Sequence, residues 1–142
     1  MSPYDPNYKH VKHYCLIGQK AIVLNAEGKI LMLKRSKKTD MAKRWSLAGG
    51  ALDKNEEPIA SIRREILEET GLTVGGITPY HVKSRLHEND QIIVIGYVCE
   101  AESENVQLNW EHTEYRWCNK EEALALPCTP DGKEFVEMYN NM

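Results

Sequence analysis

Residues 50–72 read GALDKNEEPIASIRREILEETGL and hold the clearest structural signals in the chain. Pro58 suits the first position of a helix, where its missing N–H costs no hydrogen bond. Glu56 and Glu57 precede it at the positive end of the helix dipole, and Gly71 fits the residue after the last turn. The stretch therefore predicts an acidic loop followed by a helix over residues 58–70.

One side of this predicted helix is apolar, and the neighbouring side is acidic. At about 100° per residue, Ile59, Ile62 and Ile66 fall on one stripe, which is expected to face a sheet. Beside the stripe, within an arc of about 100°, lies a set of three carboxylates: Glu65, Glu68 and Glu69. Grouping like charges this closely raises their pKa values and destabilises the helix, and a bound hard cation would relieve the repulsion.

Magnesium and manganese suit such a cluster, because they prefer oxygen ligands and leave coordination positions for substrate phosphates. Arg64 lies four residues before Glu68, so the two side chains can pair and hold the orientation of that acid. An acid-rich helix face is also typical of a solvated surface. For the helix taken alone, that second interpretation stays open.

Upstream, two short apolar runs predict an antiparallel hairpin, at residues 20–25 and 29–34. The turn between them ends at Gly28, which can take a positive φ. A basic stretch follows over residues 35–44. The sequence WSLAGG, residues 45–50, then predicts a loop whose paired glycines let the backbone turn sharply and approach a ligand.

Downstream, residues 91–99 (QIIVIGYVC) form a near-continuous apolar run that predicts a central strand. Residues 72–83 and 114–118 are weaker strand candidates. Two short closing helices are expected at residues 120–126 and 132–139, broken by Pro127 and Pro130. Because no linker or repeat divides the chain, one domain over residues 1–142 is expected.

The composition disfavours several classes of partner. The 142 residues are 42% hydrophobic and 27% charged, with a formal net charge of −3, which argues against a partner bound through bulk negative charge. There is no apolar run of about 18 residues for a membrane span, and residues 1–12 lack the apolar core of a signal peptide. A soluble, cytoplasmic protein is expected. The four cysteines are widely spaced, which favours reduced thiols that fill core space.

Every fixed position of the signature G-x5-E-x7-R-E-U-x-E-E-x-G-U, in which U is a bulky apolar residue, is filled from Gly50 to Leu72. The chain therefore resembles the Nudix hydrolase family. The preceding WSLAGG resembles the family's W-x-L-P-G-G loop, with Ala48 where proline is usual. The resemblance implies an α/β fold of the α+β kind: a Nudix-like α/β/α sandwich with a mixed central sheet, in which residues 50–72 form the catalytic loop and helix.

The resemblance also implies an enzyme that uses Mg²⁺ or Mn²⁺ to hydrolyse a diphosphate linkage in a nucleoside diphosphate derivative. A nucleoside triphosphate or a dinucleoside polyphosphate would be such a substrate. The family's metal ligands correspond here to Glu65, Glu68 and Glu69, with the Gly50 carbonyl as a further ligand. Glu56 would support the catalytic helix and its water network, while Arg64 orients Glu68.

The general base is left open by the motif, since family members use either a glutamate of the motif or an acid from a later loop. The two candidates in this chain are Glu69 and Glu111. Glu111 as a solvated loop acid is an equal alternative. Glu114 is the weaker candidate, because it leads into the predicted strand at residues 114–118.

Four residues are candidate substrate-binding groups. Arg35 and Arg44 belong to the basic stretch before the catalytic loop and could attract phosphates, although a solvated loop explains the same pattern. Tyr80 and Trp110 could stack on a base, or simply pack. The expected partner is a small nucleotide. Binding to nucleic acid is expected only for a capped RNA end, and a homodimer could form through residues 4–14.

A rival hypothesis keeps the fold without the chemistry. A nucleotide-sensing or regulatory module would bind its ligand without turnover, and a degenerate motif would be its mark. The motif in this chain is intact, which favours the enzyme.

Overall fold

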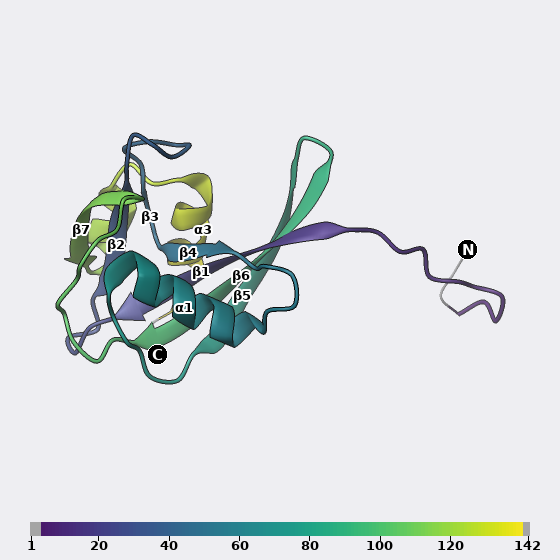
Figure 1. Cartoon of the computed structure of the whole chain (residues 1–142), viewed down its shortest axis with the longest axis horizontal. Coiled ribbons are helices and arrows are strands. Elements are labelled where there is room, and N and C mark those ends of the chain that lie inside the picture. The colour runs from purple at the N-terminus through teal and green to yellow at the C-terminus, as the bar shows by residue number, and fades with distance from the viewer. Residues whose placement is uncertain (1–3, 141–142) are drawn as a thin grey trace.

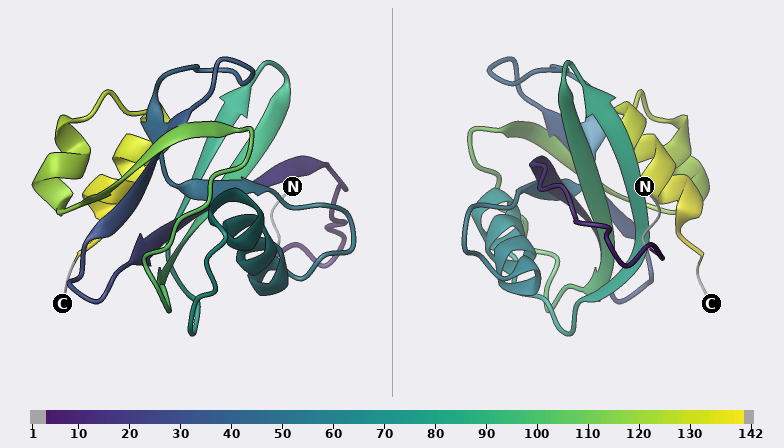
Figure 2. Two further views of the ribbon diagram at one scale, coloured as in Figure 1. Left: turned by 60° about the vertical axis from the view of Figure 1, so that its left-hand side comes forward. Right: turned by 90° about the vertical axis from the view of Figure 1, so that its right-hand side faces the viewer.

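The computed structural model describes residues 4–140, which form a mixed sheet with helices on both faces (Figure 1). The elements follow in this order: β1 (Cys15–Leu24), β2 (Ile30–Arg35), β3 (Trp45–Ser46), β4 (Ala48–Ala51), α1 (Pro58–Thr70), β5 (Thr78–His87), β6 (Asp90–Glu100), β7 (His112–Cys118), α2 (Lys120–Ala125) and α3 (Pro130–Met138). Figure 2 shows α1 on one face of the sheet and α2 with α3 on the other. The predicted α/β/α arrangement is confirmed.

The sheet has the strand order β3-β2-β1-β6-β5, and β4 and β7 pair with β1 and β2. β1 and β6 run parallel over their whole length, whereas the β1–β2 and β5–β6 pairs are antiparallel. The apolar run at residues 91–99 is thus a central strand, as predicted. The hairpin turn is also confirmed, because Gly28 has a φ of 77°.

Residues 45–50 differ from the predicted loop, because they contribute two short strands, β3 and β4. The register places Gly49 opposite Lys20 and Gly50 opposite Gln19 of β1. A Cβ at Gly49 would lie 1.9 Å from the carbonyl oxygen of Gln19, so only glycine permits this close pairing. This segment forms strands because it pairs with residues that are distant in sequence. No local sequence signal indicates a strand here.

Two other predicted boundaries are corrected. β5 begins at Thr78 and continues to His87, well beyond the predicted end at residue 83. Pro130 does not break a helix but starts α3, because the Thr129 side chain accepts a hydrogen bond from the Gly132 N–H and caps the first turn.

The hydrophobic core lies in two clusters, one on each face of the sheet. Ile62 and Ile66 belong to the cluster under α1 and are fully buried. Ile59, predicted to share their stripe, is 38% exposed, because this cluster does not reach the first turn of the helix. The four cysteines are free thiols, and Cys99 and Cys118 are buried as expected.

Residues 4–14 have neither helix nor strand pairing and extend away from the sheet before β1 (Figure 1). Val11 and Tyr14 in this segment are almost fully exposed. Within the described residues, no helix has the length and apolar character needed to cross a membrane.

Candidate active site

The loop between β4 and α1 is tied to the helix through Glu56. Its carboxylate accepts hydrogen bonds from the Asp53 N–H, the Ser61 hydroxyl and the Arg64 guanidinium. These contacts hold the pKa of Glu56 below its usual range, with the Arg64 hydrogen bond as the largest cause. Glu56 therefore fixes where the loop enters α1.

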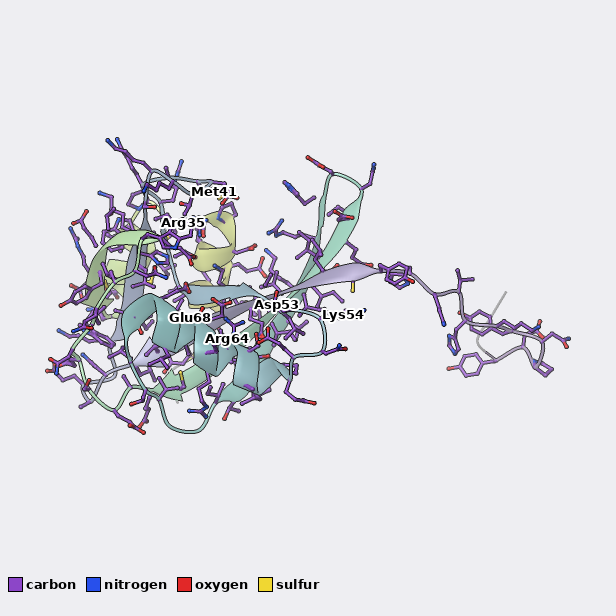
Figure 3. All side chains as sticks on the ribbon, in the orientation of Figure 1. Arg35, Met41, Asp53, Lys54, Arg64 and Glu68 are labelled. Atoms are coloured by element: carbon purple, nitrogen blue, oxygen red, sulfur yellow. The ribbon has the colours of Figure 1, made fainter. Side chains whose placement is uncertain are left out.

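Arg64 links four acids of this region. It donates to Glu56 at 3.1 Å and to Glu68 at 3.0 Å, and it lies 3.4 Å from Glu65 and 3.8 Å from Asp53. The hydrogen bonds that it donates to the carboxylates of Glu56 and Glu68 raise the pKa of Arg64. Figure 3 shows Arg64 and Glu68 on α1, with Asp53 in the preceding loop. The predicted Arg64–Glu68 pair is therefore present.

Glu65 lies against the backbone of β4 at Gly50. A Cβ at Gly50 would stand 2.8 Å from the Glu65 carboxyl carbon, so glycine makes room for this carboxylate. The Glu65 side chain is only 16% exposed. Burial is the main cause that raises its pKa, and the nearby charges of Glu68 and Glu111 act in the same direction.

Glu69 is the most buried acid of the site, at 1% exposure. Its carboxylate accepts a hydrogen bond from the Gly49 N–H, with N···O distances of 3.2 and 3.3 Å. Burial raises the pKa of Glu69 to about 8, with smaller contributions from Glu111 and Glu65, whereas the charge of Lys20 opposes the rise. A carboxyl in this environment favours a bound cation or a proton.

Glu111 lies in the turn before β7, on the same side as the acids of α1. Its backbone carbonyl accepts a hydrogen bond from the Ser36 N–H at 2.8 Å, and its side chain is half-buried. Its charge contributes to the raised pKa of both Glu65 and Glu69. Glu114 instead pairs with Lys34 at 2.8 Å within the β2–β7 ladder, as expected of a strand residue.

The acids of α1 suit a divalent cation in their chemistry. Among residues 4–140, no three acidic, histidine or cysteine side chains already stand in a coordinating arrangement. Glu68 is the most exposed of the three acids, and the Arg64 guanidinium donates hydrogen bonds to its carboxylate. The two more buried acids, Glu65 and Glu69, have raised pKa values that a hard cation would reverse, so the donor set fits the expected Mg²⁺ or Mn²⁺.

A cavity of about 430 Å³ lies on the opposite face of the sheet, beside α3. Strands β1, β2, β5 and β6, the loop between β2 and β3, and the start of α3 line it: Lys20, Arg35, Asp40, Met41, Lys83, Arg85, His87, Ile92, Thr129, Pro130 and Asp131. Arg35, a predicted phosphate-binding residue, is in this wall and pairs with Asp40 at 2.8 Å. Arg44 is exposed and does not line the cavity.

The two predicted stacking residues have different environments. The Tyr80 ring packs edge-to-face on Phe135 and Tyr139, and its hydroxyl donates to the Phe135 carbonyl. These contacts pack the half-buried Tyr80 ring against the core. Trp110 is 63% exposed and stands next to Glu111, where its ring is accessible.

Two residues near the site received no role from the sequence. Lys20 lines the cavity on β1, and Gln19 beside it donates to the Pro58 carbonyl at the start of α1. In the sequence, these two polar residues stand just before an apolar run. Strand patterning alone places them at the end of a strand and gives them no function. Their importance depends on the pairing of β1 with β4, which is not local in sequence.

Comparison with known proteins adds independent information. The model of the NUDIX domain family matches residues 17–139. A CTP pyrophosphohydrolase of Escherichia coli (strain K12) is 29% identical over 121 residues, which are 84% of this chain and 87% of that relative. An RNA pyrophosphohydrolase of Bartonella quintana (strain Toulouse) is 37% identical over 73 residues, which are 48% of this chain and 41% of that relative.

A solved structure shows the same architecture. The crystal structure of the MutT protein from Methanosarcina mazei Go1 superposes with a TM-score of 0.74 at 26% identity, covering 90% of this chain and 94% of that chain. The motif at residues 50–72, the sandwich fold and the family match agree with one another. The chain belongs to the NUDIX domain family.

Proposed function

We propose that this protein is a metal-dependent pyrophosphohydrolase that cleaves a diphosphate linkage in a nucleoside triphosphate. The observation that carries the proposal is the pair of buried carboxylates, Glu65 and Glu69, which lie against β4 with raised pKa values. The pyrophosphohydrolase names of its relatives support the same reaction class. Glu65, Glu68 and Glu69 would hold the metal, with the Gly50 carbonyl as a further ligand.

A bound Mg²⁺ or Mn²⁺ would neutralise charge on the phosphates and lower the pKa of the attacking water. The chain itself would supply orientation. Arg64 holds Glu56 and Glu68, and Gly50 leaves space for the Glu65 carboxylate. Ligand geometry would therefore be set by contacts already present in the loop and helix.

Glu111 is the better placed of the two candidate general bases. Glu69 is buried and accepts a hydrogen bond from the Gly49 N–H, so its carboxylate cannot readily turn toward a water molecule. Glu111 is half-buried, and among residues 4–140 the hydrogen bond to its carboxylate is a long one, of 3.5 Å from the Asn109 amide. We therefore assign proton acceptance to Glu111 and metal binding to Glu69.

The cavity beside α3 supports a nucleotide as the substrate. Its volume of about 430 Å³ lies within the usual range for small-molecule sites, and its wall carries Lys20, Arg35, Lys83 and Arg85. The CTP pyrophosphohydrolase relative is matched over 87% of its length. The RNA pyrophosphohydrolase relative is matched over only 41%, so a free nucleoside triphosphate is favoured over an RNA end.

A substrate panel tests the proposal. Nucleoside triphosphates, dinucleoside polyphosphates, nucleotide sugars and capped RNA are incubated with Mg²⁺ or with a chelator, and the released mononucleotide is measured. We expect Mg²⁺-dependent release from at least one triphosphate, lost in Glu69→Gln and reduced in Glu111→Gln, with both variants folded. Tight binding without turnover across the panel would instead establish the nucleotide-sensing module.

A further inference from the structure

Lys20 lies where two cavities of the protein meet. The cavity of about 430 Å³ lies on one side, and a smaller one of about 240 Å³ runs along β1 past Gly50, where the Glu65 carboxylate stands. Four residues belong to the lining of both cavities: Lys20, Arg85, Ile92 and Asp131. A molecule that reaches from the acids of α1 into the larger cavity therefore passes Lys20.

The two residues paired with Lys20 on the neighbouring strands are glycines. In the sheet register, Lys20 stands opposite Gly49 of β4 and opposite Gly96 of β6. Neither partner has a side chain that could cover the lysine from the adjacent strand. The rings of Phe135 and Tyr80 fill the space over Gly96. Lys20 itself is half-buried and lines both cavities.

The charge of Lys20 is not neutralised by an ion pair, in contrast to the other cations of the larger cavity. Arg35 pairs with Asp40, and both Lys83 and Arg85 pair with Asp131. Within residues 4–140, no carboxylate lies within 4.0 Å of the Lys20 ammonium. Glu69 interacts with it only over a longer distance, as a charge that raises the pKa of Lys20.

A lysine in this position favours an anionic ligand. Burial lowers the pKa of Lys20, because the ammonium loses water without gaining a close counter-charge. Phosphate oxygens supply both the missing hydrogen-bond acceptors and the missing charge. The location between the metal-binding acids and the larger cavity is also where the phosphate chain of a bound nucleotide would run.

We propose that Lys20 binds a phosphate group of the substrate at the junction of the two cavities, and that it acts as a binding residue in addition to Arg35. This inference rests on the function proposed above, because it takes a nucleoside triphosphate as the ligand. Lys20 would hold the phosphate chain between the metal and the nucleoside, on the strand that separates α1 from α3.

Equilibrium binding without divalent metal tests this role directly. The probe is a nucleoside triphosphate analogue with methylene groups in place of both bridging oxygens, and the matched nucleoside is the phosphate-free reference. Lys20→Met removes the charge, Lys20→Gln is a second neutral variant in case the first fails to fold, and Lys20→Arg restores the charge. Lys29→Met is the matched control: it changes a half-buried lysine of the same hairpin, in the turn just before β2 and outside both cavities.

We expect Lys20→Met to weaken binding of the analogue about tenfold or more, as is typical for a lost hydrogen bond to a charged group. Binding of the nucleoside should stay unchanged, Lys20→Arg should recover most of the affinity, and Lys29→Met should match the wild type. Wild-type affinity of Lys20→Met for the analogue would overturn the proposal. Equal losses for analogue and nucleoside would also overturn it, because they would show a disturbed cavity.

If Lys20 has a structural role and only positions Glu69, the expected results differ. If Lys20 served only to hold that carboxylate, the neutral variants would change Mg²⁺ affinity in the absence of nucleotide and leave the analogue affinity intact. The binding assay does not depend on turnover, so a failure of the proposed enzymatic function can be distinguished from a failure of the proposed phosphate site. A wild type that binds the analogue through Lys20 but hydrolyses no substrate would refute the enzyme and retain the phosphate site.

Discussion

Replacing Gly50 with alanine should disable the metal site without unfolding the protein. The new Cβ would lie 2.8 Å from the Glu65 carboxyl carbon and 2.9 Å from both carboxylate oxygens, whereas ordinary contacts begin at 3.4 Å. The Glu65 carboxylate must therefore move by about 0.6 Å, which exceeds the roughly 0.2 Å tolerance of a metal–ligand distance.

A displacement of this size at the reacting centre should lower kcat/KM by about 10- to 100-fold, or roughly 1.4 to 2.7 kcal/mol of transition-state stabilisation. The fold should tolerate the change. Gly50 does not have a positive φ, and the atoms that must yield are the end of a flexible side chain. The melting temperature of Gly50→Ala should stay within about 3 °C of the wild type.

Gly49→Ala is the matched control, one residue earlier on the same strand. Its Cβ would meet the Gln19 carbonyl oxygen at 1.9 Å, a clash of backbone with side chain that only separation of β1 and β4 can relieve. We expect this variant to lower the melting temperature by about 5 to 10 °C. Thermal unfolding and kcat/KM across a Mg²⁺ titration are measured for both variants.

Two results would refute the reasoning. Wild-type kcat/KM for Gly50→Ala at every Mg²⁺ concentration would show that the place of Glu65 against Gly50 has no role in catalysis. A loss of stability in Gly50→Ala as large as in Gly49→Ala would show that both glycines serve the fold.

The remaining predictions concern the helix acids and the aromatic residues. Arg64→Gln should raise the Mg²⁺ concentration for half-maximal activity about tenfold while kcat at saturation changes little, as a Mg²⁺ titration would show. Tyr80→Phe should cost about 1 kcal/mol in chemical unfolding with KM unchanged, whereas Trp110→Ala should raise KM without loss of stability if its ring stacks on the base. In metal-free protein the pKa of Glu69 rises from 4.5 to about 8 on folding, so its contribution to the free energy of unfolding is largest below pH 4.5 and is lost as pH rises toward 8. Urea unfolding should show a flatter pH dependence for Glu69→Gln.

The helix and its loop could be predicted from sequence because their signals are local. Pro58 and Gly71 mark the two ends of α1, and the structure places the helix at residues 58–70 as expected. Arg64 and Glu68 pair across one turn, a contact that spacing alone indicates. Metal chemistry could therefore be inferred before any long-range pairing was known.

The orientation of Tyr80 could not be predicted, because a bulge interrupts the strand at that residue. The β5–β6 register shifts between Pro79 and His81, so simple alternation does not give the face on which Tyr80 lies. Gly49 and Gly50 were expected in a loop for a similar reason. Their strand pairing depends on β1, which lies about thirty residues earlier in the chain.

The difference between local and long-range contacts also explains why the sequence predicts the reaction class but not the substrate. The acids for metal binding come mainly from one helix, so their arrangement follows from the helical repeat. The larger cavity is assembled from β1, β2, β5, β6, α3 and the loop between β2 and β3, whose side chains meet only in the folded sheet. The net charge of −3 also conceals this arrangement, because acids gather on one face and four cations line the cavity on the other. Substrate choice is therefore expected to depend on Lys20 and its neighbours across the sheet, while the residues of the motif stay the same for any diphosphate that the cavity admits.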